Sequence, residues 1–153
     1  MNTKRKLQIE QLDKKFTILK KCSEVITPSK GWLFAIRNTL NMSLKQFGRK
    51  LNITAQSAKE IEEREQTKRI TLKNLSEAAE ALDMQLIYFL IPKNESLEKT
   101  IEKRAREVGR EIVLRTSHSM SLENQENLPE RIEKAIEDKA EQLKNEIPRF
   151  LWD

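Results

Sequence analysis

The sequence predicts a mostly α-helical protein, and three observations support this prediction. Glycine and proline number only 3 and 4 among 153 residues, too few for the tight turns of a β-sandwich or barrel. Leu, Lys, Glu, Arg and Ala, which favour helices, are plentiful. Apolar residues recur every three or four positions over most of the chain, as they do along one face of a helix. A chain of this length forms one domain, or a small domain with extensions, rather than two large domains.

Residues 1–30 are expected to form a basic N-terminal helix. Four apolar residues make one stripe along this helix: Ile9, Leu12, Phe16 and Leu19. Lysines and Arg5 surround that stripe between Lys4 and Lys21. Pro28 and Gly31 then break the helical pattern, so a new unit is expected to begin there.

Residues 31–92 are expected to form four short helices followed by one strand. The first helix begins at Trp32, and the others follow residues that commonly cap helix N-termini: Ser43, Thr54 and Thr71. The segment Gln85–Pro92 is rich in β-branched and aromatic residues and ends in proline, which predicts a strand. A single strand leaves its backbone N–H and C=O groups unpaired, so this segment favours a homodimer. A buried extended connector and a helix are the alternatives.

Residues 93–153 are expected to form a C-terminal helical region. Ser96 is expected to cap a helix with five apolar residues on one face: Leu97, Ile101, Ala105, Val108 and Ile112. Pro129 is expected to be the first residue of the last helix, a position at which proline is favoured. Between the two, Thr116–Asn127 is mostly polar and could hold one or two more helical turns. The chain ends in an apolar stretch that is expected to dock on this chain or on a partner: Phe150, Leu151 and Trp152.

Positive charge is concentrated in the first part of the chain. Residues 1–60 hold 13 Lys and Arg against 4 Asp and Glu, a net charge of +9, whereas residues 61–153 hold 16 against 20, a net charge of −4. This asymmetry indicates an anionic partner for the first part. Three glutamates further on are expected to be solvated or to pair with Arg49, Lys59 or Lys68: Glu62, Glu63 and Glu65.

The composition also argues against several function classes. Cys22 and His118 are the only cysteine and histidine, so neither an internal disulfide nor a Cys/His zinc site can form, and no metal site is expected. The longest apolar run, Leu86–Ile91, has six residues against the roughly 20 that cross a bilayer, so we expect a cytoplasmic protein that binds no membrane. Without a glycine-rich phosphate loop or a catalytic constellation, no cofactor and no enzymatic activity are expected.

The segment Ser43–Glu62, SLKQFGRKLNITAQSAKEIE, has the spacing of a helix-turn-helix. Gly48 would allow the two helices to cross closely, and Asn52 tolerates the left-handed backbone of the turn. The second helix of such a motif lies in the major groove of DNA with its first turns facing the bases. A helical hairpin of the same spacing that binds no DNA is the alternative.

The expected DNA contacts divide into two groups. Phosphates are expected to pass near four residues of the first helix and its cap: Ser43, Lys45, Arg49 and Lys50. The bases are expected to face the cap and first turns of the second helix: Thr54, Ala55, Gln56, Ser57, Lys59 and Glu60. The amide of Gln56 could pair with adenine, and the methyl group of Ala55 could contact that of thymine.

These residues resemble the Cro/cI-type (XRE) helix-turn-helix regulators. The resemblance lies in T-x-Q-S-x-x-x-I-E at Thr54–Glu62, preceded by a helix with the pattern S-x-x-x-F-G-x-x-L-N-I. It implies a lambda-repressor-like helix-turn-helix bundle, with one short strand and helical N- and C-terminal extensions in this chain. Two positions depart from the usual pattern, since Ala55 replaces a glutamine and Asn52 replaces the turn glycine.

Further blocks along the chain resemble the family called mobile mystery protein A. They include G-W-L-x-x-I-R from Gly31, L-I-Y-x-L-I-P from Leu86, H-x-M-x-L-E-x-Q from His118 and the final L-W-D. This resemblance implies a regulator encoded on mobile elements beside a partner protein with a Fic domain, which transfers AMP to hydroxyl groups. Fic enzymes are often inhibited by a helix bearing S/T-x-x-x-E-G/N.

The pattern S/T-x-x-x-E-G/N occurs here at Ser119, Glu123 and Asn124. In that role, Glu123 would pair with the arginine that otherwise holds the γ-phosphate of ATP. A solvated turn with Glu123 exposed is the alternative.

The sequence therefore predicts a homodimeric, sequence-specific DNA-binding autorepressor of a palindromic operator. The resemblance to the mobile mystery protein A family implies that the chain also acts as the antitoxin of a Fic-domain AMP-transferase. Two alternatives are a free-standing helix-turn-helix regulator of a mobile element without a toxin partner, and a pure protein-interaction antitoxin.

Overall fold

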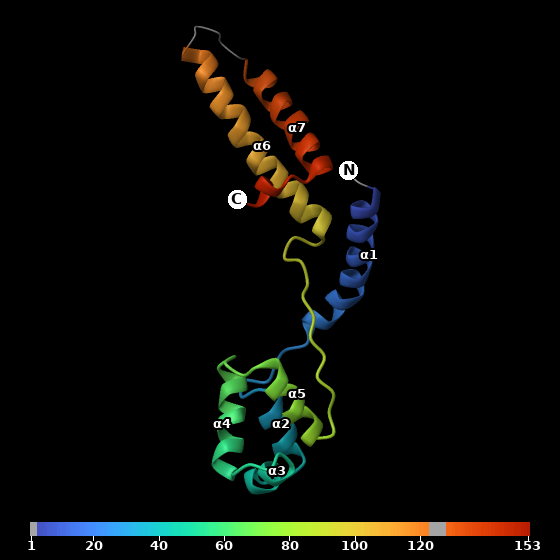
Figure 1. The fold of residues 1–153 in the computed structure, drawn as a ribbon, viewed down its shortest axis with the longest axis vertical. Coiled ribbons are helices and arrows are strands. Elements are labelled where there is room, and N and C mark those ends of the chain that lie inside the picture. Colours follow the sequence, from blue (N-terminus) through green and yellow to red (C-terminus); the bar gives the residue numbers. More distant parts are fainter. Residues whose placement is uncertain (1–2, 123–127) are drawn as a thin grey trace. The chain divides into compact units, whose positions relative to one another are not determined.

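The computed structural model describes the backbone of residues 3–122 and 128–153, and the side chains of residues 3–119 and 128–153. The chain divides into two compact units (Figure 1). One unit combines Met1–Cys22 with Leu90–Asp153, and the other is Ser23–Phe89. The N-terminal helix therefore groups with the C-terminal helices, a partition that differs from the division at residues 30 and 92 expected from the sequence.

The described residues are mostly helical, which confirms the prediction of a mostly α-helical protein. The unit Ser23–Phe89 contains four short α-helices: α2 (Trp32–Thr39), α3 (Leu44–Lys50), α4 (Ala55–Gln66) and α5 (Leu72–Ala81). Each of the predicted caps accepts a backbone hydrogen bond. Ser43 accepts from the N–H of Gln46, Thr54 from that of Ser57, and Thr71 from that of Asn74, over 3.1–3.2 Å. Short-range cap signals therefore set where α3, α4 and α5 begin.

A small apolar core holds these four helices together. Its five buried residues come from every one of them: Leu33, Phe47, Ala58, Ala78 and Leu82, the last just after α5. Phe47 and Ala58 are completely buried, so they anchor α3 and α4 to the same core. The side chains on the opposite faces of α3 and α4 are consequently left to the solvent.

The predicted strand at Gln85–Pro92 is not formed. No strand occurs among the described residues, and these eight residues run irregularly from the end of α5 toward α6 (Figure 1). The physical reason is that a strand needs a partner for its N–H and C=O groups, and the single described chain offers no sheet edge. Strong β propensity alone does not make a strand.

The other unit consists of α1 (Thr3–Leu19), α6 (Leu97–Leu122), α7 (Pro129–Glu146) and a 3₁₀ helix, η2 (Arg149–Trp152). A second 3₁₀ helix, η1 (Lys20–Glu24), follows α1 directly. The chains of α6 and α7 run antiparallel (Figure 1) around a core of five buried residues: Ile101, Ala105, Val108, Leu143 and Leu151. Ser96 caps α6 through the N–H of Lys99, and Pro129 opens α7, both as predicted. No helix in the described ranges is long and apolar enough to cross a bilayer.

The end of the chain docks only in part as expected. Leu151 is fully buried, whereas Phe150 and Trp152 are half exposed. Arg104 of α6 fixes this end, because its guanidinium donates to the backbone oxygens of Leu151 and Asp153.

Asp13 joins α1 to α6 in a way that the sequence does not signal. Its carboxylate accepts the backbone N–H groups of Leu97, at 2.7 Å, and Glu98, at 3.2 Å. These N–H groups belong to the first turn of α6 and have no partner inside the helix. Asp13, which precedes Leu97 by 84 residues in the sequence, therefore completes the N-terminal cap of α6.

We expect Asp13→Ala to lower the free energy of unfolding of this unit by about 1–2 kcal/mol, because α6 loses a charged N-terminal acceptor. Urea unfolding followed by the fluorescence of Trp152, in a Trp32→Phe background, measures the change. Glu10→Ala on the same helix is the matched control, since the side chain of Glu10 is exposed and no hydrogen bond to the start of α6 is recorded for it. Equal losses for the two variants would contradict the capping role.

Candidate nucleic-acid interface

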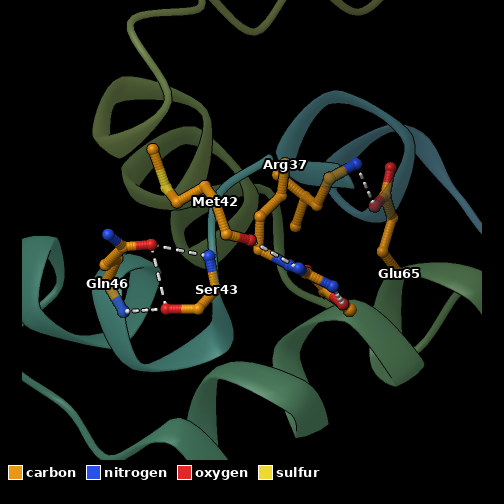
Figure 2. Close-up of polar contacts among 7 residues, drawn as sticks. Arg37, Met42, Ser43, Gln46 and Glu65 are labelled. Atoms are coloured by element: carbon orange, nitrogen blue, oxygen red, sulfur yellow. Dashed lines mark hydrogen bonds and ion pairs between the residues drawn. The ribbon is translucent and has the colours of Figure 1, made fainter. Parts of the chain in front are cut away.

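The candidate interface is built on α3, the turn that follows it, and the first turns of α4. At the start of α3, Ser43 and Gln46 form a reciprocal cap (Figure 2). The N–H of Ser43 donates to Oε1 of Gln46 at 2.8 Å, and the N–H of Gln46 donates to Oγ of Ser43 at 3.2 Å. The hydroxyl of Ser43, a predicted phosphate contact, is therefore exposed but already engaged in the cap.

The turn between α3 and α4 confirms the predicted roles of Gly48 and Asn52. A Cβ atom at Gly48 would lie 2.7 Å from the backbone oxygen of Ile53 and 3.0 Å from that of Thr54. The N–H of Ile53 also donates to the carbonyl oxygen of Gly48 at 2.9 Å. Asn52 has a φ of 56°, in the left-handed region that asparagine tolerates. These contacts bring the end of α3 against the start of α4.

The predicted base-facing residues of α4 remain accessible. Ala55, Gln56, Lys59 and Glu60 are exposed, as is the cap residue Thr54. Ser57 is half-buried, and the hydroxyl of Thr54 donates to its Oγ at 3.0 Å. Lys59 and Glu60 form exposed ion pairs with other residues of α4, at 3.8 Å to Glu63 and 3.5 Å to Arg64.

The predicted phosphate contacts also lie at the surface. Lys45, Arg49 and Lys50 on α3 are exposed. Nζ of Lys50 lies 4.0 Å from a carboxylate oxygen of Asp83, and both side chains are well solvated, so this pair leaves the lysine available to a stronger anion. We call the exposed cations of α3 and the exposed start of α4 the recognition surface: Lys45, Arg49, Lys50, Ala55, Gln56 and Lys59.

A buried ion pair fixes α4 against α2. The guanidinium of Arg37 binds both carboxylate oxygens of Glu62, and its Nη1 donates to the backbone oxygen of Met42 at 2.7 Å (Figure 2). The side chains of Arg37 and Glu62 are only 10% and 7% exposed. An ion pair so shielded from water is held in one geometry, so the axis of α4 is set relative to α2 and α3.

Glu65 adds a second tie between α4 and α2. Its two carboxylate oxygens accept the N–H groups of Trp32 and Leu33, each at 2.9 Å (Figure 2 labels Glu65). These are the first two N–H groups of α2, so Glu65 caps that helix from 32 residues away. The expectation that Glu62 and Glu65 are solvated or pair with Arg49, Lys59 or Lys68 is therefore wrong, whereas Glu63 does pair with Lys59.

A signal for these two ties is present in the sequence. Ala58, Glu62 and Glu65 have the spacing i, i+4, i+7, so both carboxylates share the inward face of α4. Arg37 follows the buried Leu33 by four positions and therefore shares the inward face of α2. Charged residues on buried helix faces indicate a pair, because an isolated buried charge is too costly.

The second predicted site falls mostly outside the described residues. Ser119 is exposed near the end of α6, and its hydroxyl donates to the backbone oxygen of Arg115 at 3.1 Å. Glu123 and Asn124 lie outside the residues that the structure describes. Within the described ranges, no group of three or more His, Cys, Asp or Glu side chains could hold a metal ion.

Comparisons with models of known protein families, with curated proteins and with solved structures found no match.

Proposed function

We propose that this chain is a sequence-specific regulator that binds double-stranded DNA and represses its own operon. The observation that carries this proposal is the exposed first turn of α4, where Ala55 and Gln56 face solvent on a helix that Ala58 and Glu62 anchor from behind. A rigid helix with short polar side chains at its exposed start fits the major groove. The cations of α3 flank this start, as phosphate contacts require.

Each part of the recognition surface has a distinct role in this proposal. The amide of Gln56 offers one donor and one acceptor, the pattern that adenine matches in the major groove. The methyl group of Ala55 fits beside that of thymine. Lys45, Arg49 and Lys50 neutralise phosphates and set the register of the protein on the duplex. Ser43 and Thr54 add neutral hydroxyls beside these cations.

We propose that two copies bind one operator. A twofold-symmetric pair would present two α4 helices to half-sites about one helical turn apart, which is why a palindromic operator is expected.

We expect Gln56→Ala to weaken binding to the operator by roughly tenfold while leaving nonspecific binding nearly unchanged, because only the contact to a base is lost. Fluorescence anisotropy with DNA from the chain's own promoter, and with a scrambled duplex, measures both affinities. Gln11→Ala is the matched control, since Gln11 is an exposed glutamine of α1. The same titrations between about 50 and 200 mM salt should show a steep loss of affinity, and Lys45→Ala should reduce the slope by about 1.

Three results would count against this function. Binding that does not depend on salt would exclude the phosphate contacts. If Gln56→Ala lowers the affinity for the operator and for the scrambled duplex equally, Gln56 does not contact a base. No footprint on the promoter at all would favour the alternative in which the chain is a pure protein-interaction antitoxin.

Inhibition of a Fic-domain AMP-transferase encoded beside this chain is the second proposed role. Ser119 is exposed near the end of α6, where it is accessible to a partner. A partner gene without a Fic domain would instead favour the free-standing regulator.

We expect Glu123→Ala to restore AMP transfer by a co-expressed Fic-domain partner, because the arginine of that enzyme would again hold the γ-phosphate of ATP. Transfer of labelled AMP in the purified complex is the measurement, and operator binding by the same variant should be unchanged. Glu130→Ala, at the start of α7, is the charge-matched control. Full inhibition by Glu123→Ala would remove Glu123 from the inhibitory role.

A further inference from the structure

The segment Met84–Pro92 has an unusual surface for a connecting segment. Ile87 and Tyr88 are each 71% exposed and Leu90 is 81% exposed, and Met84 and Phe89 are also exposed. Within the described part of the chain, residues 85–93 form no backbone–backbone hydrogen bond. Both backbone edges of an apolar segment are therefore open, which is the situation that β pairing with another strand resolves.

The described part of this chain cannot supply that strand. Apart from helices and runs of at most five residues between them, it holds one other irregular run, residues 25–31, which contains Pro28 and a turn at Ser29 and Lys30. Proline lacks the N–H group that a ladder needs, and three residues before it are too few to cover the nine-residue segment Met84–Pro92. The partner strand has to come from another chain.

We propose that this partner is a second copy of the same chain, and that Met84–Pro92 pairs antiparallel with its own counterpart, with Tyr88 opposite Tyr88. Segments related by a twofold axis can pair with themselves only in the antiparallel direction. This interface adds a structural basis to the proposed function, because it would place two α4 helices on one palindromic operator. That consequence rests on the proposed function.

The charges at the two ends of the segment select this register. With Tyr88 on the axis, Asp83 of each copy lies opposite Lys93 of the other. A slip of one residue in either direction would place Asp83 opposite Pro92 or Asn94 instead, so both ion pairs would be lost. The side chain of Asp83 is 93% exposed and reaches only Lys50, at 4.0 Å, so it is accessible to a second chain.

The apolar side chains also match in this register. Leu86 lies opposite Leu90 and next to the Tyr88 pair on one face, whereas Ile87 lies opposite Phe89 on the other. Cross-strand aromatic and aliphatic pairs of this kind stabilise antiparallel ladders. Asp83 follows the C-terminal cap of α5, Leu82, and has a φ of 57°, so it is not extended. The ladder therefore begins at Met84, and the Asp83–Lys93 pairs flank its two ends.

Single-cysteine variants test the register directly. In a Cys22→Ser background, Tyr88→Cys should form a disulfide-linked dimer on mild oxidation, because opposed residues lie about 4.5–5.5 Å apart. Leu86→Cys should link at least about tenfold more slowly, because the two copies of residue 86 are four positions apart along the ladder, about 13 Å. A mixture of Leu86→Cys and Leu90→Cys chains should again link rapidly. Non-reducing gels give the rates, and equal rates for Tyr88→Cys and Leu86→Cys would overturn the register.

The oligomeric state tests the interface itself. Sedimentation equilibrium of the full chain should show a dimer, and Leu90→Asp should raise its dissociation constant by more than about 100-fold, because two carboxylates per dimer lose their water. Leu72→Asp is the matched control, an exposed leucine on α5. A monomeric wild type, or a dimer unaffected by Leu90→Asp, would overturn the proposal.

A half-site duplex separates this failure from failure of the DNA-binding function. We expect Leu90→Asp to bind a single half-site as well as the wild type does and to lose its advantage on the full palindrome. If the wild type forms this dimer but binds neither duplex, the proposed function fails and the interface stands.

Discussion

Glu62→Ala is expected to lower the free energy of unfolding of the unit Ser23–Phe89 by about 3–5 kcal/mol. The variant leaves the guanidinium of Arg37 on a side chain that is 10% exposed, with only the backbone oxygen of Met42 as a recorded acceptor. A buried charge that loses its counterion keeps the cost of desolvation and loses the attraction that offsets it. Because folded units commonly have only about 5–15 kcal/mol of stability, this loss is large.

The two tryptophans allow each unit to be followed separately, because Trp32 begins α2 and Trp152 ends η2. In a Trp152→Phe background, urea unfolding observed by fluorescence reports the unit that contains Arg37 and Glu62. Glu63→Ala is the matched control, because Glu63 forms an exposed pair with Lys59 at 3.8 Å and should cost less than about 1 kcal/mol. A similar small loss for Glu62→Ala would show that the buried pair does not hold α2 and α4 together.

A double variant separates the loss of the pair from the loss of packing. Arg37→Met combined with Glu62→Leu removes both charges and keeps apolar volume at the same place. We expect this variant to recover much of the stability lost in Glu62→Ala, because apolar replacements of buried ion pairs are often tolerated. Recovery is expected to be incomplete, since the backbone oxygen of Met42 loses the donor that it has at 2.7 Å.

In this protein, the features that could be predicted from the sequence depend on interactions between residues that are close together in the chain. Ser43, Thr54, Thr71 and Ser96 cap helices through N–H groups three residues further on, so a window of four residues contains the whole signal. The exposure of Gln56 likewise follows from the helical period around the buried Ala58. Local rules therefore predict the helix starts and the accessible face of α4.

Interactions between distant elements were not predicted, because a local window shows at most which face of a helix a residue occupies and does not specify the partner on another element. The carboxylate of Asp13 could have faced solvent on α1, and only the folded unit shows that it caps α6. The helical period places Glu65 on the inward face of α4, but only the folded unit shows that its carboxylate caps α2. The strand prediction for Gln85–Pro92 was wrong although the local signal was strong. The composition of this segment favours a strand, but one chain alone does not provide the second strand that it needs.

Gly48→Val is the other substitution with a large expected effect, about 3 kcal/mol of lost stability in the unit Ser23–Phe89. A Cβ atom at this position would meet two backbone oxygens, at 2.7 Å from Ile53 and 3.0 Å from Thr54, and neither can rotate away as a side chain would. Relief requires α3 and the start of α4 to separate. Because the recognition surface spans both helices, we also expect operator binding to be lost at temperatures where the variant remains folded.

Gly109 provides the matched control, since it is also a buried glycine at a close helix crossing. A Cβ atom there would lie 3.1 Å from the backbone nitrogen of Ala140, a tight contact that a small shift relieves. Gly109→Ala also gains about 1 kcal/mol of helix propensity, so its net effect on the unit that contains α6 and α7 should stay within about 1 kcal/mol. Urea unfolding of both variants, with operator affinity measured in parallel, compares the two crossings. If Gly48→Val unfolds at the wild-type urea concentration and still binds the operator, α3 and α4 do not need this close approach, and the rigid presentation of Gln56 loses its structural basis.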